Sequence, residues 1–346
     1  MISGFTLSDR IKTNSVSRIH VYGDWDADGF VSTALLVYSQ EKLGQYPLKT
    51  NAIIFKKPIE PEKFRYIFND LNKQIDLLVF LDIPFTDSIG RILGIIKNHF
   101  SVKHIMYVDH HLSTFNNREL LLKNVDTLIV DTSKPTCKII HDILVENNLN
   151  IQSRLKAFVD VITYMDTGRR IPSNYMKLFD LIKSFSKALN ITRDPDLWIR
   201  IVDWLVEPIA VSQSDLVESV KRIVDKYERE MNDLALDLAI TSVKIGDFKF
   251  IDARSKWRRR GASALASKLA GILKSHIILW IDTRKDYTIL IIKASSGKAY
   301  KLGEYLVKEK IAIDSTGHPN LAIVKIPRSV SKEELLETLH KVIYYL

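Results

Sequence analysis

The segment Arg18-Ile-His-Val-Tyr-Gly-Asp-Trp-Asp-Ala-Asp-Gly29 decides the fold of this chain. Its first six residues form a short apolar run, which is typical of a buried strand. An acidic turn follows directly, and positions 29–43 then show the spacing of a helix with one polar face. The segment therefore predicts a strand, a tight turn and a helix in succession.

The same order of strand and helix repeats through the first half of the chain. Further buried strands are predicted at 51–55, 76–81, 104–108 and 127–130, and further helices at 61–72 and 86–98. Strand and helix in alternation at this spacing predict an α/β fold with a doubly wound, mainly parallel sheet.

The second half begins with helical patterns and then returns to alternation. Helices are predicted at 138–147, 153–165, 174–184 and 195–205, followed by a long charged helix at 215–239 that contains no Gly or Pro. Strands are predicted at 242–252, 276–282, 287–293 and 320–326, with helices at 261–273, 302–309 and 332–345. We therefore expect a first domain at 1–210, a linking helix at 211–240 and a smaller α/β domain at 241–346.

The composition is that of an ordinary globular protein. Of 346 residues, 46% are apolar and 26% are charged, and only 13 Gly and 10 Pro are present, which excludes a collagen-like or Pro/Gly-rich chain. Cys137 is the single cysteine, so a disulfide framework and a thiolate metal cluster are excluded, and the thiol is expected to be a small buried side chain. No stretch of about 20 uncharged apolar residues occurs. We expect a cytoplasmic protein that is not associated with a membrane.

Positive charge is concentrated in the last third of the chain. Residues 241–346 carry 20 Lys and Arg against 10 Asp and Glu, whereas residues 1–240 carry 30 against 31. A basic module of this kind indicates a polyanionic partner, and a surface of solvated lysines is the alternative.

Three predicted strands end in aspartate. The acidic residues lie after the first, third and fourth strands and are Asp24, Asp26, Asp28, Asp82 and the run Asp109-His110-His111. Carboxyl ends of parallel strands share one edge of the sheet, so these side chains should converge. Converging carboxylates repel one another, and carboxylates with imidazoles suit Mn²⁺, Mg²⁺, Fe²⁺ or Zn²⁺. A pair of such ions commonly hydrolyses phosphoesters. For any single residue a helix N-cap is the alternative, with Asp28 before Gly29 as the candidate.

The motifs Asp24-x-Asp26-x-Asp28-Gly29, Asp82, Asp109-His110-His111 and Tyr164-Met-Asp166-Thr-Gly168 resemble the four ordered motifs of the DHH phosphoesterase superfamily. That superfamily includes RecJ-type single-strand exonucleases, short-oligonucleotide nucleases, cyclic-dinucleotide phosphodiesterases and family II pyrophosphatases. The motifs span about half of the chain. The resemblance implies a catalytic DHH domain joined to a DHH-associated C-terminal domain.

The resemblance also implies two divalent metal ions, with manganese preferred and magnesium as the alternative. The implied ligands are Asp26, Asp28, Asp82, His110 and Asp166, with Asp82 bridging the two ions. His111 would contact the scissile phosphate, and Asp109 would orient its neighbours. Many members carry a histidine where this chain has Tyr22, and Asp24 is the implied replacement.

Two segments of the last third resemble the signatures of the DHH-associated domain. They are Ala294-Ser-Ser-Gly297 and Ser315-Thr-Gly-His-Pro319, which implies that Ser295, Gly317 and His318 bind substrate. In the family the second signature is a glycine-rich loop whose backbone approaches phosphate. This chain departs from the family where Ala294 replaces a usual arginine and Leu321-Ala-Ile replaces a run of small residues.

Three further segments allow two interpretations each. The hydroxyls and N–H groups of residues 131–138 either bind phosphate at a helix start or include a plain N-cap at Ser133. Arg169 and Arg170, which follow Asp166, either hold a substrate phosphate or face solvent. For Lys256-Trp-Arg-Arg-Arg260, one interpretation is that Trp257 stacks on bases while Arg258 contacts phosphates, and the other is that Trp257 is buried.

Together these features favour a metal-dependent phosphodiesterase that removes nucleotides from single-stranded or short DNA or RNA. The basic C-terminal module favours this function over a pyrophosphatase. One alternative is a RecJ-related replication scaffold with little or no catalysis and with replication or repair proteins as partners. A cyclic-dinucleotide or small-nucleotide phosphodiesterase is the other. An inactive scaffold has no chemical reason to keep Asp28, Asp82 and His110 together.

Overall fold

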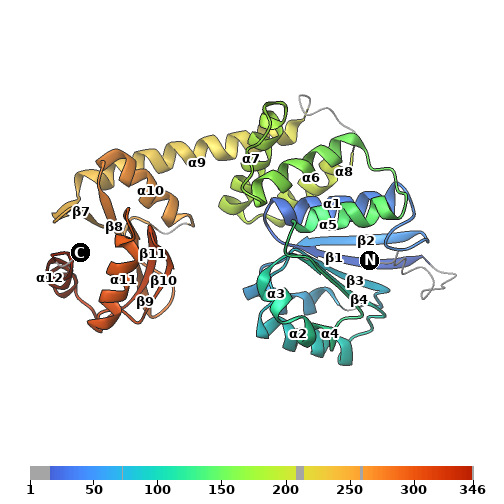
Figure 1. The fold of residues 1–346 in the computed structure, drawn as a ribbon, viewed down its shortest axis with the longest axis horizontal. Coiled ribbons are helices and arrows are strands. Elements are labelled where there is room, and N and C mark those ends of the chain that lie inside the picture. The colour runs from blue at the N-terminus through green and yellow to red at the C-terminus, as the bar shows by residue number, and fades with distance from the viewer. Residues whose placement is uncertain (1–15, 72, 208–213, 258–259, 345–346) are drawn as a thin grey trace. The chain divides into compact units, whose positions relative to one another are not determined.

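The computed structural model describes residues 16–71, 73–207, 214–257 and 260–344. The chain divides into two compact units, Met1–Val224 and Asp225–Leu346, and the division lies within helix α9 (Asp215–Ile240). Each unit has its own sheet (Figure 1). Each unit also has its own hydrophobic cores. Across the described ranges, no helix is both long and apolar enough to cross a membrane.

The first unit is built on five parallel strands. They are β1 (Ser17–Gly23), β2 (Ala52–Pro58), β3 (Leu77–Leu81), β4 (Ile105–Asp109) and β5 (Thr127–Val130). Their order in the sheet is β2-β1-β3-β4-β5, which confirms the predicted parallel α/β fold. Because the order reverses at β1 and β3, a topological switch point lies between the carboxyl ends of these two strands.

Helices cover both faces of this sheet. Val21 and Val79 share one core with α1 (Ala27–Glu41), α5 (Thr136–Glu146), α6 (Ser153–Asp166), α7 (Met176–Thr192) and α8 (Pro195–Val206). Tyr22 and Phe80, which are the next residues along the same strands, share the opposite core with η2 (Pro61–Asp70) and α2 (Asp87–His99). Alternate strand residues point to opposite faces, so the sheet is doubly wound.

Several helix boundaries differ from the sequence predictions. The helix predicted at 61–72 is the 3₁₀ helix η2, and the one predicted at 174–184 is a 3₁₀ turn, η3 (Ser173–Tyr175), followed by α7. Helix α7 ends where Arg193 adopts a φ of 48°. The helices α3 (Leu112–Asn116) and α4 (Arg118–Leu122) were not predicted because five residues are too few to show a helical period.

The second unit is built on a mixed sheet of six strands. They are β6 (Val243–Ile245), β7 (Phe248–Asp252), β8 (His276–Ile281), β9 (Tyr287–Lys293), β10 (Asp314–His318) and β11 (Leu321–Pro327), in the order β10-β11-β9-β8-β7-β6. Only the pair β7–β8 is parallel among these strands. Helices α11 (Lys298–Lys308) and α12 (Lys332–Ile343) cover one face, and α10 (Ala262–Leu273) with the second half of α9 covers the other.

Two sequence predictions for this unit were wrong in detail. The single strand predicted at 242–252 is the hairpin β6–β7, which turns at Gly246 with a φ of 57°. The loop expected around Gly317 is strand β10, which pairs with β11. A Cβ on Gly317 would lie 2.2 Å from the carbonyl oxygen of Leu321. A side chain at position 317 would clash with the backbone of the paired strand β11, so this contact requires glycine, and no phosphate is needed to explain it.

Candidate metal centre

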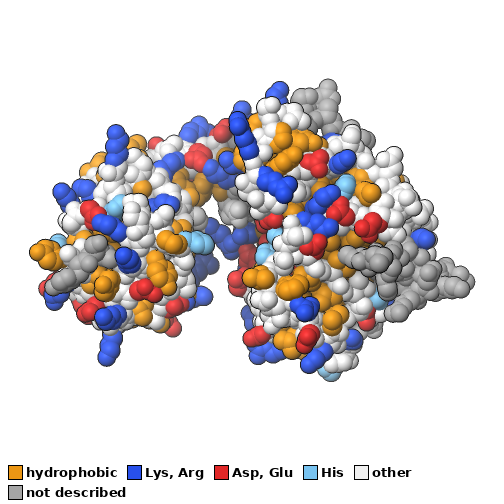
Figure 2. Space-filling model, in the orientation of Figure 1, with side chains coloured by type: hydrophobic (Ala, Val, Ile, Leu, Met, Phe, Trp, Pro, Cys, Tyr) orange, Lys and Arg blue, Asp and Glu red, His pale blue; other side chains and the backbone are white. Residues whose placement is uncertain are grey.

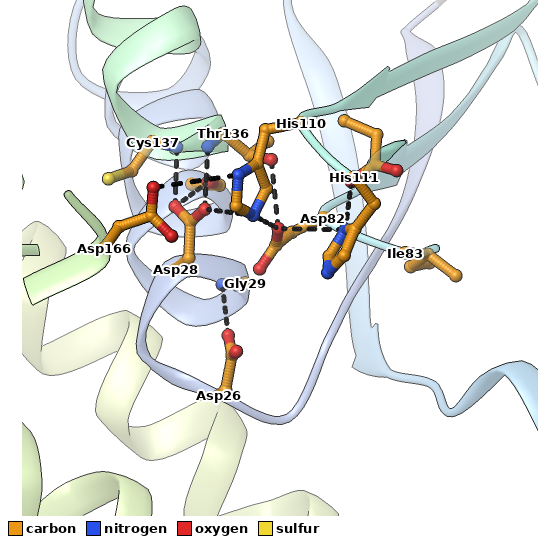
Figure 3. Close-up of polar contacts among 12 residues, drawn as sticks. Asp26, Asp28, Gly29, Asp82, Ile83, His110, His111, Thr136, Cys137 and Asp166 are labelled. Carbon is orange, nitrogen blue, oxygen red and sulfur yellow. Dashed lines mark hydrogen bonds and ion pairs between the residues drawn. The ribbon is translucent and has the colours of Figure 1, made fainter. Parts of the chain in front are cut away.

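Acidic and imidazole side chains from four elements meet at the switch point of the first unit. Asp28 lies in the first turn of α1, Asp82 directly follows β3, His110 and His111 directly follow β4, and Asp166 ends α6 (Figure 3). The rule that parallel strands bring their carboxyl ends to one edge therefore predicted the meeting of Asp28, Asp82 and the two histidines. Asp166 joins them from a helix, outside that rule.

The turn between β1 and α1 is fixed by its own backbone. Asp26 is the N-cap of α1, and its Oδ1 accepts a hydrogen bond of 3.1 Å from the N–H of Gly29. A Cβ on Gly29 would lie 2.4 Å from the carbonyl oxygen of Asp24, so this turn requires a glycine. Asp26, and not Asp28, is therefore the N-cap, and its exposed side chain points toward the start of α1 (Figure 3).

Asp28 is buried and occupies the N-terminus of α5. Its Oδ2 accepts the N–H of Thr136 and its Oδ1 accepts the N–H of Cys137, each at 2.7 Å. The helix start that was considered as a phosphate site is thus taken by a carboxylate. The N-cap at Ser133 was also wrong, because the N–H and Oγ of Ser133 bond to Asp131 and Pro135 is the residue before α5.

Asp82 lies in a strained and fully buried position. It is 1% exposed and has a φ of 61°, a left-handed conformation that aspartate tolerates better than most residues. Its Oδ1 accepts a hydrogen bond of 3.0 Å from the hydroxyl of Thr136. Burial, followed by the negative charges of Asp28 and Asp26, raises the pKa of Asp82 well above its usual value. A bound cation would offset this cost because it favours the charged carboxylate.

His110 presents both ring nitrogens to carboxylates. Its Nε2 lies 3.4 Å from Asp82 Oδ1 and 3.7 Å from Asp28 Oδ2, and its Nδ1 lies 3.9 Å from Asp166 Oδ2. These separations are longer than hydrogen bonds. One ligand atom from each of Asp82, His110 and His111 also lies within 4.8 Å of the other two. This mixed set of oxygen and nitrogen donors fits a divalent cation such as Mn²⁺ or Mg²⁺.

His111 is held by a buried carboxylate. Its Nδ1 lies 2.8 Å from Asp109 Oδ1, and Asp109 is fully buried. The Thr114 hydroxyl donates to Asp109 Oδ2 and accepts the N–H of Phe85 at 2.9 Å. Burial by itself lowers the pKa of His111. The hydrogen bond to Asp109 and the negative charge of Asp109 oppose this effect of burial, and the charges of Asp26 and Asp24 act in the same direction as Asp109. Together these contributions raise the pKa of His111 above its usual value. Asp109 thereby fixes the orientation of the His111 ring and favours its protonated form.

Asp24 and Tyr22, which adjoin Gly23 at the end of β1, lie in different environments. Burial, followed by the charge of Asp26, raises the pKa of Asp24 to about 7. The charge of Asp24 in turn acts on Asp82 and His111. Tyr22 is fully buried on the opposite face of the sheet, where its hydroxyl donates to Asp70 at 3.0 Å. Tyr22 therefore does not contribute to the metal centre.

Sequence reasoning missed Thr114 and did not predict the contacts of Thr136, and both threonines organise the centre. Thr136 bonds to Asp28 through its N–H and to Asp82 through its hydroxyl, so it joins two of the acidic side chains. Thr114 fixes Asp109. Thr136 lies in the segment 131–138 that was considered for phosphate binding, whereas Thr114 belongs to no recognised motif. A signal for Thr136 was Pro135, because proline is common at the start of a helix and the residues after it expose free N–H groups.

The substrate residues predicted in the second unit are exposed. Ser295, Gly317 and His318 lie at the surface, and their two segments are adjacent, since the N–H groups of Ala294 and Gly297 bond to the carbonyl and side-chain oxygens of Asn320 at 3.2 and 3.3 Å. In the first unit, Arg169 and Arg170 are also exposed.

Trp257 is in the interior of the second unit. Its side chain is 2% exposed and belongs to a core that includes Leu265 and Leu279. The buried interpretation is therefore correct for Trp257, and its predicted stacking on a base was wrong because no face of the ring reaches solvent. Arg258 lies outside the described residues.

Comparisons with known proteins agree with this arrangement at the level of the fold. Scans against protein-family profiles and against curated proteins give no match. Among solved structures, the DHH domain of a member of a family of ribosomal proteins aligns with a TM-score of 0.59 and 14% identity, over 95% of this chain and 87% of that one. RecJ from Thermus thermophilus in complex with Mn²⁺ aligns with a TM-score of 0.60 and 14% identity, over 95% of this chain and 52% of RecJ.

A further structure, exonuclease RecJ bound to manganese, aligns with a TM-score of 0.53 and 13% identity over 94% of this chain and 89% of that one. The chain thus spans about half the length of the Thermus RecJ. Together with the order of the strands and the position of the acidic motifs, these likenesses show that the chain has the fold of the DHH superfamily, as the resemblance of its motifs implied.

Proposed function

We propose that this protein is a metal-dependent phosphodiesterase, specifically an exonuclease that hydrolyses single-stranded or short DNA or RNA to nucleotides. The observation that carries the proposal is the meeting of Asp28, Asp82, His110, His111 and Asp166 at the switch point. Two RecJ structures that share the fold contain manganese, which supports the same class of ion here.

The proposed metal ligands are Asp28, Asp82, His110 and Asp166, with Asp24 and Asp26 as additional ligands from the β1–α1 turn. Manganese is the preferred ion and magnesium the alternative, with two ions in the site. Bound ions of this kind activate a water molecule and stabilise charge on the phosphate and the leaving oxygen.

The protein's own residues hold this site in a fixed geometry. The N–H groups of α5 and the hydroxyl of Thr136 fix Asp28 and Asp82, so little reorganisation is needed when an ion or a phosphate binds. Asp109 occupies Nδ1 of His111 and leaves Nε2 for a substrate. A protonated His111 would donate a charge-assisted hydrogen bond from Nε2 to a phosphate oxygen.

The second unit is proposed to bind the phosphates of a nucleic acid strand. Lys and Arg outnumber Asp and Glu by 20 to 10 in residues 241–346, and basic side chains are present on the face of this unit that Figure 2 shows. Ser295 and His318 would contact phosphate, and so would Arg169 of the first unit. Binding of this kind should weaken as the salt concentration rises.

The test is digestion of end-labelled single strands of DNA and RNA, from dinucleotides to long oligomers, with Mn²⁺ or Mg²⁺. The test variant is Asp82→Asn, which keeps the shape of a buried side chain, and the matched control is Asp203→Asn, an exposed aspartate of α8. Release of mononucleotides that depends on the metal, is lost in Asp82→Asn and is kept in Asp203→Asn would support the proposal.

Two other outcomes would overturn the exonuclease assignment. Hydrolysis of dinucleotides alone, or of cyclic dinucleotides added as separate substrates, would identify a small-nucleotide phosphodiesterase. If wild-type protein and Asp82→Asn bound single strands equally and neither cleaved them, a scaffold in a replication or repair assembly would replace the enzyme.

A further inference from the structure

The short helix α3 is fixed directly to the His111 end of the site. His111 is the residue before this helix, and its carbonyl oxygen accepts the N–H groups of Thr114 and Phe115, each at 3.1 Å. The side chain of Thr114 bonds to Asp109, which holds the His111 ring. The other side chains of α3 are therefore presented at a fixed position beside His111.

Two of these side chains are large, apolar and exposed. Leu112 is 65% exposed and Phe115 is 39% exposed. They are three residues apart, so they lie on the same side of the helix. Figure 2 shows hydrophobic side chains at the surface of the first unit where Figure 1 places α3. Single exposed apolar residues are ordinary, but this pair lies within four residues of His111, a histidine of the polar site.

A guanidinium group accompanies the aromatic ring. Arg118 lies over Phe115 at 4.7 Å from the ring centroid, and its Nη1 donates to the Phe115 carbonyl at 3.4 Å. An aromatic ring with a guanidinium group beside it can stack on a nucleobase and contact the neighbouring phosphate. Neither water nor inorganic pyrophosphate would make use of an apolar aromatic surface at this position.

We propose that Phe115, with Leu112 and Arg118, forms a stacking surface for the base of the nucleotide whose phosphate contacts His111. This inference rests on the proposed nuclease function and specifies how its substrate is held. Stacking on an aromatic ring is available to every base. The surface would therefore favour nucleotides over other phosphoesters without selecting a sequence.

The experiment compares matched dinucleotides that contain either a base or an abasic residue at each position in turn. The variants are Phe115→Ala and Phe115→Tyr, and the control is Leu122→Ala, another exposed apolar residue, on α4. Two quantities are measured for each protein in Mn²⁺: kcat/KM for hydrolysis, and the affinity for a fluorescently labelled dinucleotide by anisotropy. Thermal unfolding checks that each variant is folded.

The wild-type protein is expected to favour the base-containing dinucleotide by about 5-fold to 150-fold at one of the two positions, in line with the energy of base–aromatic stacking. Phe115→Ala should lose this preference while matching wild type on the abasic substrate. Phe115→Tyr should keep the preference, and Leu122→Ala should behave as wild type.

The inference is overturned if Phe115→Ala keeps the full preference for the base, or if wild type shows no preference at either position. Its failure is distinguishable from failure of the proposed function. Binding that depends on the base and on Phe115, without any hydrolysis, would contradict the nuclease while supporting the stacking surface. Hydrolysis that depends on Asp82 but not on Phe115 would support the nuclease and contradict the stacking surface.

Discussion

The two units of this protein present their candidate functional residues in opposite ways. In the first unit, Asp28, Asp82 and Asp109 are buried; Asp28 and Asp82 accept hydrogen bonds from α5, and Asp109 bonds to the nearby Thr114. In the second unit, Ser295 and His318 are exposed near a hairpin. Buried groups are positioned by the surrounding fold, so the site depends on all of them together, whereas each exposed group makes its contacts independently of the others. Substitutions should therefore have large effects in the first unit and small effects in the second.

The largest effect is expected for Asp82→Asn. Loss of the carboxylate charge at the centre of the site should reduce metal-dependent hydrolysis by at least about 10³-fold, because charge stabilisation by a bound ion contributes several kcal/mol. Calorimetric titration with Mn²⁺ should show weakened binding. Equal activity and Mn²⁺ affinity in Asp82→Asn and in the control Asp203→Asn would contradict this prediction.

Asp109→Asn should have the next largest effect. The variant keeps the size of the side chain but removes the charge that favours protonated His111. Activity should fall by about 10- to 100-fold, as is common for residues that support a metal ligand or its neighbour. The pKa of His111, followed by NMR, should also fall. If activity fell with the His111 pKa unchanged, the loss would be a general structural defect.

The first unit could be predicted largely from sequence because its signals are strong and local. Apolar runs identified all five strands, and the rule for parallel sheets placed Asp28, Asp82 and His110 at one edge. Sequence could not distinguish Asp26 from Asp28 as the N-cap, because the two residues are adjacent to the same turn. The role of Thr136 was missed because it depends on a contact with Asp28, which lies 108 residues away.

The second unit was harder to predict. Strand β10 lacks the alternation of apolar and polar residues that reveals an edge strand, since its residues are partly or fully exposed. Trp257 stands in a run of basic residues, and that charge concealed its burial against Leu265. Local composition reports the charge of a segment, whereas burial of one ring depends on distant residues.

Trp257→Phe tests whether this buried residue of the second unit contributes to stability and not to binding of single strands. Replacing a buried indole by a smaller ring should lower the free energy of unfolding by about 1–3 kcal/mol, as is usual for loss of core packing. Affinity for single strands at a temperature where the variant is folded should stay within about 2-fold of wild type. A large loss of affinity at full stability would instead place Trp257 at the nucleic acid surface.

The dependence of stability on pH gives a further test of the first unit. The pKa of Asp24 is raised to about 7, so the folded protein retains a proton that the unfolded chain releases above about pH 4. With a chelator present, stability should therefore fall between about pH 4 and pH 7. Asp24→Asn should reduce this fall in stability. Each kcal/mol of pH-dependent free energy that the substitution removes should appear as a change of about 2–4 °C in Tm. Unchanged pH dependence in Asp24→Asn, measured beside Asp203→Asn, would contradict the prediction.

The switch point of the first unit is proposed to hold divalent metal, and anomalous scattering from crystals grown with Mn²⁺ tests this most directly. We expect manganese peaks bounded by Asp82, His110 and either Asp28 or Asp166, and loss of those peaks in Asp82→Asn. Manganese bound elsewhere, or no manganese at this edge of the sheet in a folded crystal, would contradict the proposed metal centre.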